Sequence, residues 1–379
     1  MNVAIIGGGA SGTLAALRIK VNNPNIDVTI YEKNSKILKK VATTGNGRCN
    51  LSNEDISLDK YQHQSIIKEM IDLGYKDSML EFFHYLGLFT TVEDGRIYPK
   101  SNQAATVVEL ISKELFYKKV NVVLNKEITS IITKNDKYIV DGILYDKVLI
   151  CVGTNASVNN YSCELLNSLN LKLEKFTPAL VGFKVKEDIS SLFGVRANAT
   201  VKLGEYSSKG EVMFKEDGVS GICVMDLSVF YDKDKILSFD FLDDYSFEML
   251  KMVVNRKIKN DPYVHLHNLL FGSVNNKLLG MFNKGFPNSK VTTLEEAVLD
   301  SYLKQFKDFK LTITNTYPIT NAHVAKGGID LDELNLFEVK NKPNMFILGE
   351  ATDQVGICGG FNLWYAFTSA LIEADKKCK

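Results

Sequence analysis

The stretch Val3-Ala4-Ile5-Ile6-Gly7-Gly8-Gly9-Ala10-Ser11-Gly12 determines which fold we expect for this chain of 379 residues. Its four apolar residues predict a short buried strand, and the glycines after them predict a tight turn. The apolar spacing up to about Lys20 predicts a helix, and residues 27–31 are typical of a second strand. These segments form a βαβ unit, which is the building block of a parallel sheet.

Gly7, Gly9 and Gly12 have the G-x-G-x-x-G spacing of a dinucleotide-binding turn. The first glycine permits the tight turn, the second lets a pyrophosphate approach the backbone, and the third lets the helix pack on the strand. Glu32 ends the second strand, where a carboxylate accepts hydrogen bonds from an adenosine ribose and repels a 2′-phosphate. The alternative is a glycine-rich turn that serves close packing alone.

The turn by itself does not distinguish NAD from FAD, but the order of segments along the chain does. A final strand, residues 344–348, and a second glycine-led helix, beginning at Gly359-Gly360, come at the far end of the sequence. Closure of the nucleotide-binding domain by the C-terminal segment is the chain order of FAD proteins, so we expect FAD. A second G-x-G-x-x-G followed by a helix and an acid is absent from the sequence, so NAD(P)H as electron donor would have to dock transiently.

The middle of the chain predicts a separate domain. Residues 179–242 alternate between apolar and polar, as antiparallel strands do, and residues 245–308 return to helical spacing. Thr293-Leu294-Glu295-Glu296 predicts a capping box at the start of the last of these helices. We expect an α/β fold in which residues 1–177 and 319–379 form an FAD-binding, Rossmann-like domain of the glutathione-reductase type. A β-barrel-like plus helical domain, residues 178–318, is inserted as a substrate or cap domain.

Composition and charge indicate which class of protein this chain belongs to and which partners we do not expect. Hydrophobic residues are 45% and charged residues 24% of the chain, which predicts a folded globular protein. The 45 Lys and Arg residues balance 45 Asp and Glu residues, so we expect neither nucleic acid nor an anionic membrane as partner. The sequence contains neither an apolar run of about 18 residues nor an export signal, so we expect a cytoplasmic protein. Its oligomeric state stays open.

The cysteines and histidines predict no metal site. Six cysteines are scattered without a C-x-x-C pair, which predicts reduced thiols and neither a zinc ribbon nor a redox dithiol. His265 and His267 are two residues apart in a stretch of helical spacing, so their rings cannot share one helix face.

The segment Thr44-Gly45-Asn46-Gly47-Arg48-Cys49-Asn50 resembles the T-G-x-G-R-C-N motif of a bacterial flavoprotein family. The members are NAD(P)/FAD-dependent oxidoreductases, also described as aminoacetone oxidase family FAD-binding enzymes. Four further segments match in family order, namely residues 95–101, 326–329, 349–353 and 359–363. The resemblance therefore covers both ends of the chain.

The resemblance implies a set of cofactor-binding residues. It places the loop from Gly45 to Asn50 along the FAD, Glu350 at the ribityl chain, and the helix that begins at Gly359-Gly360 at the flavin ring. Ile128 is a candidate backbone contact to the adenine, and Gly153 belongs to a turn that seals the cleft. The full predicted set is Gly7, Gly9, Ala10, Ser11, Gly12, Glu32, Lys33, Lys40, Thr44, Gly45, Gly47, Arg48, Cys49, Asn50, Ile128, Gly153, Gly349, Glu350, Gly359, Gly360, Phe361, Asn362 and Leu363.

Tyr98 and Asn50 are the predicted catalytic residues, because both lie in family-like segments expected near the flavin ring. Either would hold or protonate a substrate; the alternative is that both only hold loops together. Cys49 is single, and a buried structural thiol is the favoured interpretation over a nucleophile.

The function implied by the resemblance is hydride transfer between a small organic substrate and flavin N5. One version is aminoacetone-type amine oxidation with release of peroxide. The other is NAD(P)H-driven reduction of an enone, because the family includes bile-acid-pathway flavoproteins proposed to reduce steroid enones. Two further hypotheses are a non-catalytic flavin-containing binding module and a plain NAD-linked dehydrogenase, which would be colourless.

Overall fold

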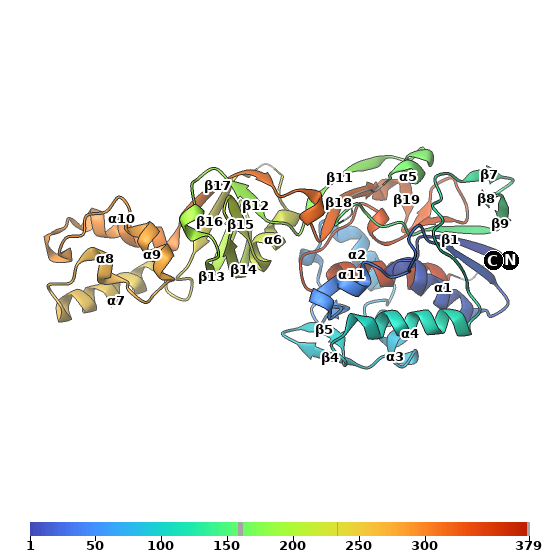
Figure 1. Cartoon of the computed structure of the whole chain (residues 1–379), viewed down its shortest axis with the longest axis horizontal. Helices are drawn as coiled ribbons and strands as arrows, with labels where there is room; N and C mark the ends of the chain where they lie inside the picture. The colour runs from blue at the N-terminus through green and yellow to red at the C-terminus, as the bar shows by residue number, and fades with distance from the viewer. Residues whose placement is uncertain (158–161, 233, 377–379) are drawn as a thin grey trace. The chain divides into compact units, whose positions relative to one another are not determined.

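The computed structural model describes residues 1–157, 162–232 and 234–376 and divides the chain into two compact units. Unit 1 joins the two ends of the chain, Met1–Thr177 and Val324–Lys379, and unit 2 is the middle, Pro178–His323 (Figure 1). An α/β fold with an inserted barrel, as the sequence predicts, is confirmed. Among the described residues, no helix has both the length and the apolar character needed to cross a membrane.

A seven-stranded sheet forms the centre of unit 1, in the order β19-β20-β21-β10-β1-β2-β6. The strands from β21 to β6 run parallel to one another, while β19 and β20 pair antiparallel at one edge. The bounds are β1 (Asn2–Ile6), β2 (Asp27–Tyr31), β6 (Asn121–Val123), β10 (Lys147–Ile150), β19 (Leu334–Asn335), β20 (Glu338–Val339) and β21 (Met345–Ile347). Strands β1 and β10 are almost wholly buried, in keeping with their continuous apolar sequence.

Helices α1 (Ala10–Asn22) and α11 (Phe361–Asp375) lie side by side and run in the same direction. Near their C-terminal ends, Arg18 Nε donates to Asp375 Oδ1 over 2.5 Å, and the Asn22 side chain donates to the Ala374 carbonyl over 3.0 Å. Toward their N-terminal ends, Ser11 and Ala366 both border Gly349. Because the two helices are parallel, their N-termini lie at the same end of the pair.

Smaller elements complete unit 1. Ring contacts such as the edge-to-face pair of Phe83 and Phe367, 5.1 Å between centroids, tie α3 to α11. The remaining helices are α2 (Gln64–Asp72), α3 (Ser78–Tyr85), α4 (Ala104–Tyr117) and α5 (Glu164–Ser168). Two three-stranded sheets have the orders β3 (Ser52–Asn53), β5 (Arg96–Pro99), β4 (Thr90–Glu93) and β7 (Ile132–Lys134), β8 (Lys137–Val140), β9 (Ile143–Tyr145). A two-stranded sheet pairs β11 (Leu173–Ala179) with β18 (Val324–Ile329).

Unit 2 consists of a closed six-stranded barrel and of helices that share its core. Phe282 of α9 packs between Phe306 of α10, 4.8 Å between ring centroids, and Phe309 of β17, 5.4 Å. The barrel order is β12 (Phe183–Val185), β15 (Gly218–Ser220), β14 (Tyr206–Phe214), β13 (Arg196–Leu203), β16 (Ile236–Asp240), β17 (Phe309–Thr316), and the helices are α6 (Ile222–Val229), α7 (Phe247–Asn260), α8 (Leu266–Leu269), α9 (Asn276–Asn283) and α10 (Glu296–Lys307).

The predicted capping box is wrong. Glu295 is the N-cap residue of helix α10, and its side chain makes no capping hydrogen bond. Thr293 belongs to a preceding 3-10 turn, where its hydroxyl donates to the Lys290 carbonyl over 2.8 Å. Because Glu295 is the N-cap residue, Thr293 lies two residues before the position from which its side chain would cap α10.

Unit 1 contains a buried ion pair between Lys147 of β10 and Glu373 of α11. The Glu373 side chain is fully buried, and burial raises its pKa to about 7, although Lys147 and Lys376 act to lower it. The folded state thus binds this proton more tightly than the unfolded state does. The carboxyl therefore contributes stability that is present below pH about 4.5 and is lost as pH rises toward about 7.

We expect Lys147→Met to lower the free energy of unfolding by about 3–5 kcal/mol, because it leaves a buried carboxyl without its cation. The double variant Lys147→Met/Glu373→Leu should recover most of this loss. Urea denaturation followed by circular dichroism measures both, with Glu373→Gln as a control that removes the decline in stability between pH 4.5 and 7. Equal destabilisation in the single and double variants would contradict the role given to the pair.

Candidate functional site

Four predicted site residues follow the ends of four neighbouring parallel strands. Gly7 follows β1, Glu32 follows β2, Gly153 lies three residues beyond β10, and Gly349 lies two residues beyond β21. Parallel strands end at one edge of a sheet, so the structure brings these four positions to the same edge. Ligands of open α/β sheets bind at that edge.

The three glycines of the first turn have different surroundings. A Cβ at Gly7, where φ is +109°, would lie 2.3 Å from the Cys151 carbonyl oxygen, and one at Gly12 would lie 2.0 Å from the Gly7 carbonyl oxygen. A Cβ at Gly9 would have no atom within 4 Å. Gly7 and Gly12 are therefore required by close packing, whereas Gly9 faces open space.

Helix α1 begins directly at this open space. Gly9 is its N-cap residue, no side chain caps the helix, and the Gly9 carbonyl accepts from Thr13 N over 3.1 Å. The N–H groups of Ala10 and Ser11 have no acceptor within the helix, as in the first turn of any helix. Such a terminus attracts an anion such as a pyrophosphate.

Glu32 is fixed at the end of β2. One carboxylate oxygen accepts from Gly8 N over 2.8 Å, and the other accepts from the backbone and side-chain nitrogens of Asn34 over 2.8 and 2.6 Å. Lys126 N donates to the Glu32 carbonyl, which sets the segment leading to Ile128 beside this strand end. The oxygen that accepts from Gly8 can accept one further hydrogen bond, so a ribose hydroxyl would fit here.

Lys40 and Glu350, which are 310 residues apart in the sequence, form an ion pair of 2.8 Å. Glu350 lies in a short 3-10 turn, Gly349–Ala351, that follows β21. A Cβ at Gly349 would lie 2.9 Å from Ser11 Oγ, so this turn packs directly against α1. The structure therefore brings together two residues that the sequence assigns to the same cofactor.

The loop of residues 44–50 has an unusual backbone. Gly45, Asn46, Gly47 and Cys49 all have φ between +55° and +82°. A Cβ at Gly45 would lie 2.8 Å from Asn50 N, whereas one at Gly47 would meet nothing within 4 Å. Left-handed conformations at non-glycine residues concentrate at functional sites, and this loop contains two of them.

Asn50 and the N-terminus of α11 meet at this loop. A Cβ at Gly360, the N-cap of α11, would lie 2.8 Å from Asn50 Oδ1, and Asn53 Nδ2 donates to the Gly359 carbonyl over 3.0 Å. Asn50 Oδ1 is buried and has no hydrogen-bond partner among the described residues. Buried polar atoms are normally satisfied, so a ring N–H or a hydroxyl of a bound cofactor fits this acceptor.

Arg48 and Tyr98 lie on the other side of the loop. The Arg48 guanidinium donates to Glu93 over 2.5 Å and to Asn102 over 2.8 Å, and it stacks 4.2 Å from the centroid of the Tyr98 ring. The Tyr98 ring borders Gly45, next to Asn50. The two predicted catalytic residues are thus neighbours, while Arg48 is tied to the hairpin of β4 and β5. Their assignments to cofactor and substrate stay predictions.

Two predicted residues have structural roles for their side chains. Cys49 is buried, and burial raises the pKa of its thiol to about 11, so it stays protonated at neutral pH. Asn362 accepts from Gly356 N over 2.8 Å and donates to the Gly356 carbonyl over 2.9 Å, which closes the loop before α11. Its backbone N–H still lies in the first turn of α11.

Sequence reasoning missed two residues that hold the turn before α11. Asn53 donates to Gly359, and the Tyr61 hydroxyl donates to the Phe361 carbonyl over 3.1 Å. Asn53 could have been found from the sequence, because this residue ends the segment that contains the T-G-x-G-R-C-N motif. Tyr61 has no comparable signal, because its contact joins positions 300 residues apart.

Comparisons with known proteins identify the family of this chain. The family described as "HI0933-like protein Rossmann domain" matches residues 1–376. The chain is 31% identical to the 3-dehydro-bile acid delta(4,6)-reductase of Clostridium scindens, over 98% of this chain and 97% of the relative. It is 21% identical to the ribosomal RNA dihydrouridine synthase of Escherichia coli, over 97% and 95% of the two chains.

Some solved structures are similar to this chain at lower sequence identity. The open conformation of a flavocytochrome c3 fumarate reductase has a TM-score of 0.49 and 12% identity, covering 99% of this chain and 77% of that one. The 3-ketosteroid delta1-dehydrogenase from Sterolibacterium denitrificans has a TM-score of 0.46 and 12% identity, covering 98% of each chain.

We expect Gly9→Ala to weaken FAD binding by about tenfold or more while leaving the melting temperature unchanged, because its Cβ enters open space that the pyrophosphate would occupy. Gly12→Ala is the matched control, and it should lower the melting temperature because its Cβ overlaps the Gly7 carbonyl oxygen. Titration of the apoprotein with FAD and thermal denaturation separate the two effects. Unchanged FAD affinity in Gly9→Ala would contradict the assignment of this space.

Proposed function

The chain belongs to the HI0933-like family of FAD-dependent oxidoreductases, and on that premise we propose that it reduces a carbon–carbon double bond conjugated to a carbonyl group. The observation that carries this proposal is the 31% identity, over 98% of the chain, to a 3-dehydro-bile acid delta(4,6)-reductase. By its name, that relative acts on double bonds conjugated to a 3-oxo group. The dihydrouridine synthase, by its name, saturates a uracil bond that is also conjugated to a carbonyl.

The residues present fit FAD. The uncapped start of α1 at Gly9 would bind the pyrophosphate, and Glu32 would bind the adenosine ribose. Glu350, paired with Lys40, would accept hydrogen bonds from the ribityl hydroxyls. The buried, unpaired Asn50 Oδ1 would accept a hydrogen bond from the flavin ring. When bound, FAD supplies hydride transfer, and the protein supplies position and electrostatic field.

Helix α11 supplies part of that field. It begins at Gly360 without a side-chain cap, so the N–H groups of its first turn and the positive end of its dipole are available. Directed at the N1–C2 edge of a flavin, they would stabilise negative charge there. The Lys40 ammonium, 2.8 Å from Glu350, would add positive charge near the same end of the sheet.

Reduction of a conjugated double bond also requires a proton at the carbon next to the carbonyl. The Tyr98 hydroxyl is our assigned donor, because its ring is held against Gly45 and under Arg48. The Asn50 side-chain amide would orient the substrate carbonyl. NAD(P)H would dock transiently as the source of electrons. The scattered cysteines of the sequence, without a C-x-x-C pair, accord with a cytoplasmic enzyme.

A stopped-flow experiment tests the direction of the reaction. We expect the FAD-loaded protein, reduced without oxygen, to be reoxidised by a 3-oxo-4,6-diene steroid or by a uridine nucleoside, but not by the saturated 3-oxo steroid. NADH and NADPH are compared as reductants in separate arms. Aminoacetone, with peroxide measured in air, tests the amine-oxidase alternative. Bleaching of the oxidised flavin by aminoacetone, with no reaction of either unsaturated compound, would replace our proposal by amine oxidation.

Tyr98→Phe tests the assigned proton donor. We expect the rate of reoxidation by the unsaturated substrate to fall by about 100-fold or more, as for loss of a general acid. FAD affinity should stay unchanged, because the phenyl ring keeps the stacking with Arg48. A wild-type rate in this variant would show that Tyr98 only holds the loop.

A further inference from the structure

Unit 2 contains a pocket at one end of its barrel, where β13 begins and β14 and β17 end. Its volume is about 460 Å³, within the range of small-molecule sites. All the residues that line it belong to unit 2, and none of them is assigned to FAD or to the proposed reaction. The lining includes Phe193, Arg196, Met213, Lys215, Glu216 and Tyr317.

The backbone of β13 and β14 forms one wall of this pocket. Gly194 N donates to the Phe214 carbonyl over 3.0 Å, and Phe214 N donates to the Val195 carbonyl over 2.9 Å. Arg196 is the cross-strand partner of Met213. Because directly opposite residues of an antiparallel pair lie on the same face, the Arg196 and Met213 side chains are neighbours on this wall.

Tyr317, which directly follows β17, forms the opposite wall. Its backbone N donates to the Gly182 carbonyl over 3.0 Å, and its hydroxyl donates to Asp217 Oδ1 over 2.6 Å. A Cβ at Gly218 would lie 2.7 Å from the Tyr317 hydroxyl oxygen, so this glycine leaves room for the ring. The ring is therefore held in place at both of its ends.

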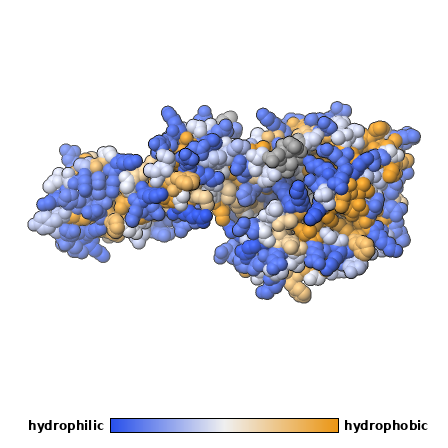
Figure 2. Space-filling model, viewed as in Figure 1, coloured by the Kyte–Doolittle hydropathy of each residue, from blue (hydrophilic) through white to orange (hydrophobic). Residues whose placement is uncertain are grey.

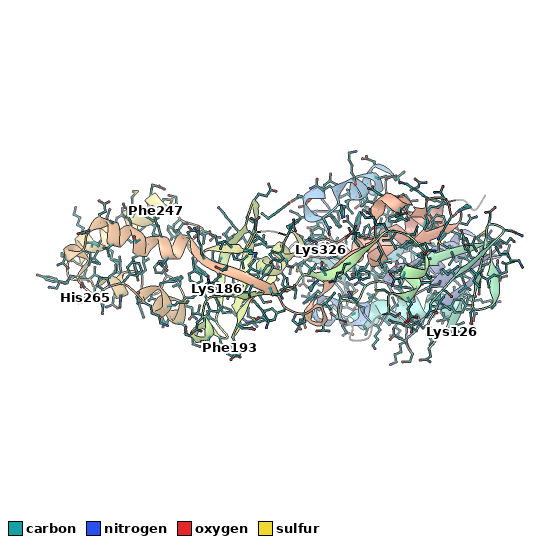
Figure 3. The ribbon with its side chains drawn as sticks, turned by 90° about the horizontal axis from the view of Figure 1, so that it is seen from above. Lys126, Lys186, Phe193, Phe247, His265 and Lys326 are labelled. Atoms are coloured by element: carbon teal, nitrogen blue, oxygen red, sulfur yellow. The ribbon has the colours of Figure 1, made fainter. Side chains whose placement is uncertain are left out.

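Phe193 adds an exposed ring to the pocket. The surface of unit 2 seen in Figure 2 is largely hydrophilic, with apolar residues in small patches. Phe193 is 62% exposed, and Figure 3 shows it at the outer edge of the barrel. Lys277 Nζ donates to the Phe193 carbonyl over 3.3 Å, which fixes the backbone here. An exposed ring that borders a pocket offers a contact surface to a ligand.

Two cations of the pocket are available to an anion. Lys215 is half-buried, its Nζ lies 4.5 Å from the Tyr317 ring centroid, and it lies more than 4.0 Å from every carboxylate among the described residues. Arg196 contacts Glu211 at 3.4 Å, but both side chains are exposed, so water screens this pair. A carboxylate between the two cations would give each of them a charged partner.

Two carboxylates also line the pocket. Asp217 is paired with Lys184 at 2.7 Å, and Lys184, together with the Tyr317 hydroxyl, holds the pKa of this carboxyl below its usual range. Glu216 is exposed and lies more than 4.0 Å from every cation among the described residues. Its charge opposes anions in proportion to their charge, so a single carboxylate fits better than a phosphate.

We propose that this pocket binds a small organic anion, in which an apolar aromatic body carries one carboxylate. The aromatic body packs against Phe193, Met213 and Tyr317, because rings and thioethers make favourable contacts with aromatic faces. The carboxylate accepts from Arg196 and Lys215. The inference does not depend on the reductase activity, since binding is measured without turnover.

The test titrates the FAD-loaded full chain with para-benzoylbenzoate, a two-ring carboxylate, by isothermal calorimetry. We expect it to bind at least about tenfold more tightly than the neutral para-benzoylbenzamide, and Arg196→Gln/Lys215→Gln to remove this preference. Phe193→Ala should weaken binding of both compounds about fivefold. Glu216→Gln should strengthen binding of the carboxylate about twofold, because it removes a like charge.

The matched control, Lys202→Gln/Lys235→Gln, removes two exposed lysines of the same barrel that do not line the pocket, and it should bind like the unaltered chain. Melting temperature verifies that every variant is folded. Ultraviolet light couples the benzophenone group of the probe to the side chains that it contacts, and we expect the labelled peptides to contain Phe193 or Met213. Equal binding of acid and amide, equal losses in control and test variants, a label outside the pocket, or displacement of the probe by inorganic phosphate would overturn the proposal.

Discussion

The parallel packing of α1 against α11 is the constraint on which the rest of unit 1 depends. One helix comes from each end of the chain. Arg18 pairs directly with Asp375, and Gly349 packs against both Ser11 of α1 and Ala366 of α11. Both helices begin with glycine and without a side-chain cap, so two groups of unsatisfied N–H donors lie at one end of the pair. This arrangement favours a ligand such as FAD, which has an anionic pyrophosphate and, separated from it, a ring that gathers negative charge on reduction.

Local sequence predicted the parts of this arrangement that depend on local geometry. Gly7 and Gly12 are required by atoms within the same βαβ unit or the adjacent strand end, and Glu32 lies at its expected strand end. The capping box failed because α10 begins two residues later than the motif requires, with Glu295 rather than Thr293 as its N-cap. A spacing rule identifies residue types but does not determine at which residue a helix begins.

Contacts between distant segments could not be derived from spacing. The pair of Lys40 and Glu350 and the tie between Arg48 and Glu93 depend on how loops meet after folding. Family resemblance brought Lys40 and Glu350 into one predicted set without implying that they touch. The sequence also could not predict that Asn50 Oδ1 lacks a hydrogen-bond partner among the described residues, because this depends on which atoms surround it in the folded chain.

The discontinuity of unit 1 has a consequence for biosynthesis. Its sheet needs β21 and its helical layer needs α11, both of which leave the ribosome after unit 2. Unit 2 is contiguous, and its barrel closes between strands that are all translated earlier. Domains fold as units during synthesis, so the nascent chain completes the inserted unit first, and its N-terminal segment stays unfinished until β21 and α11 have emerged.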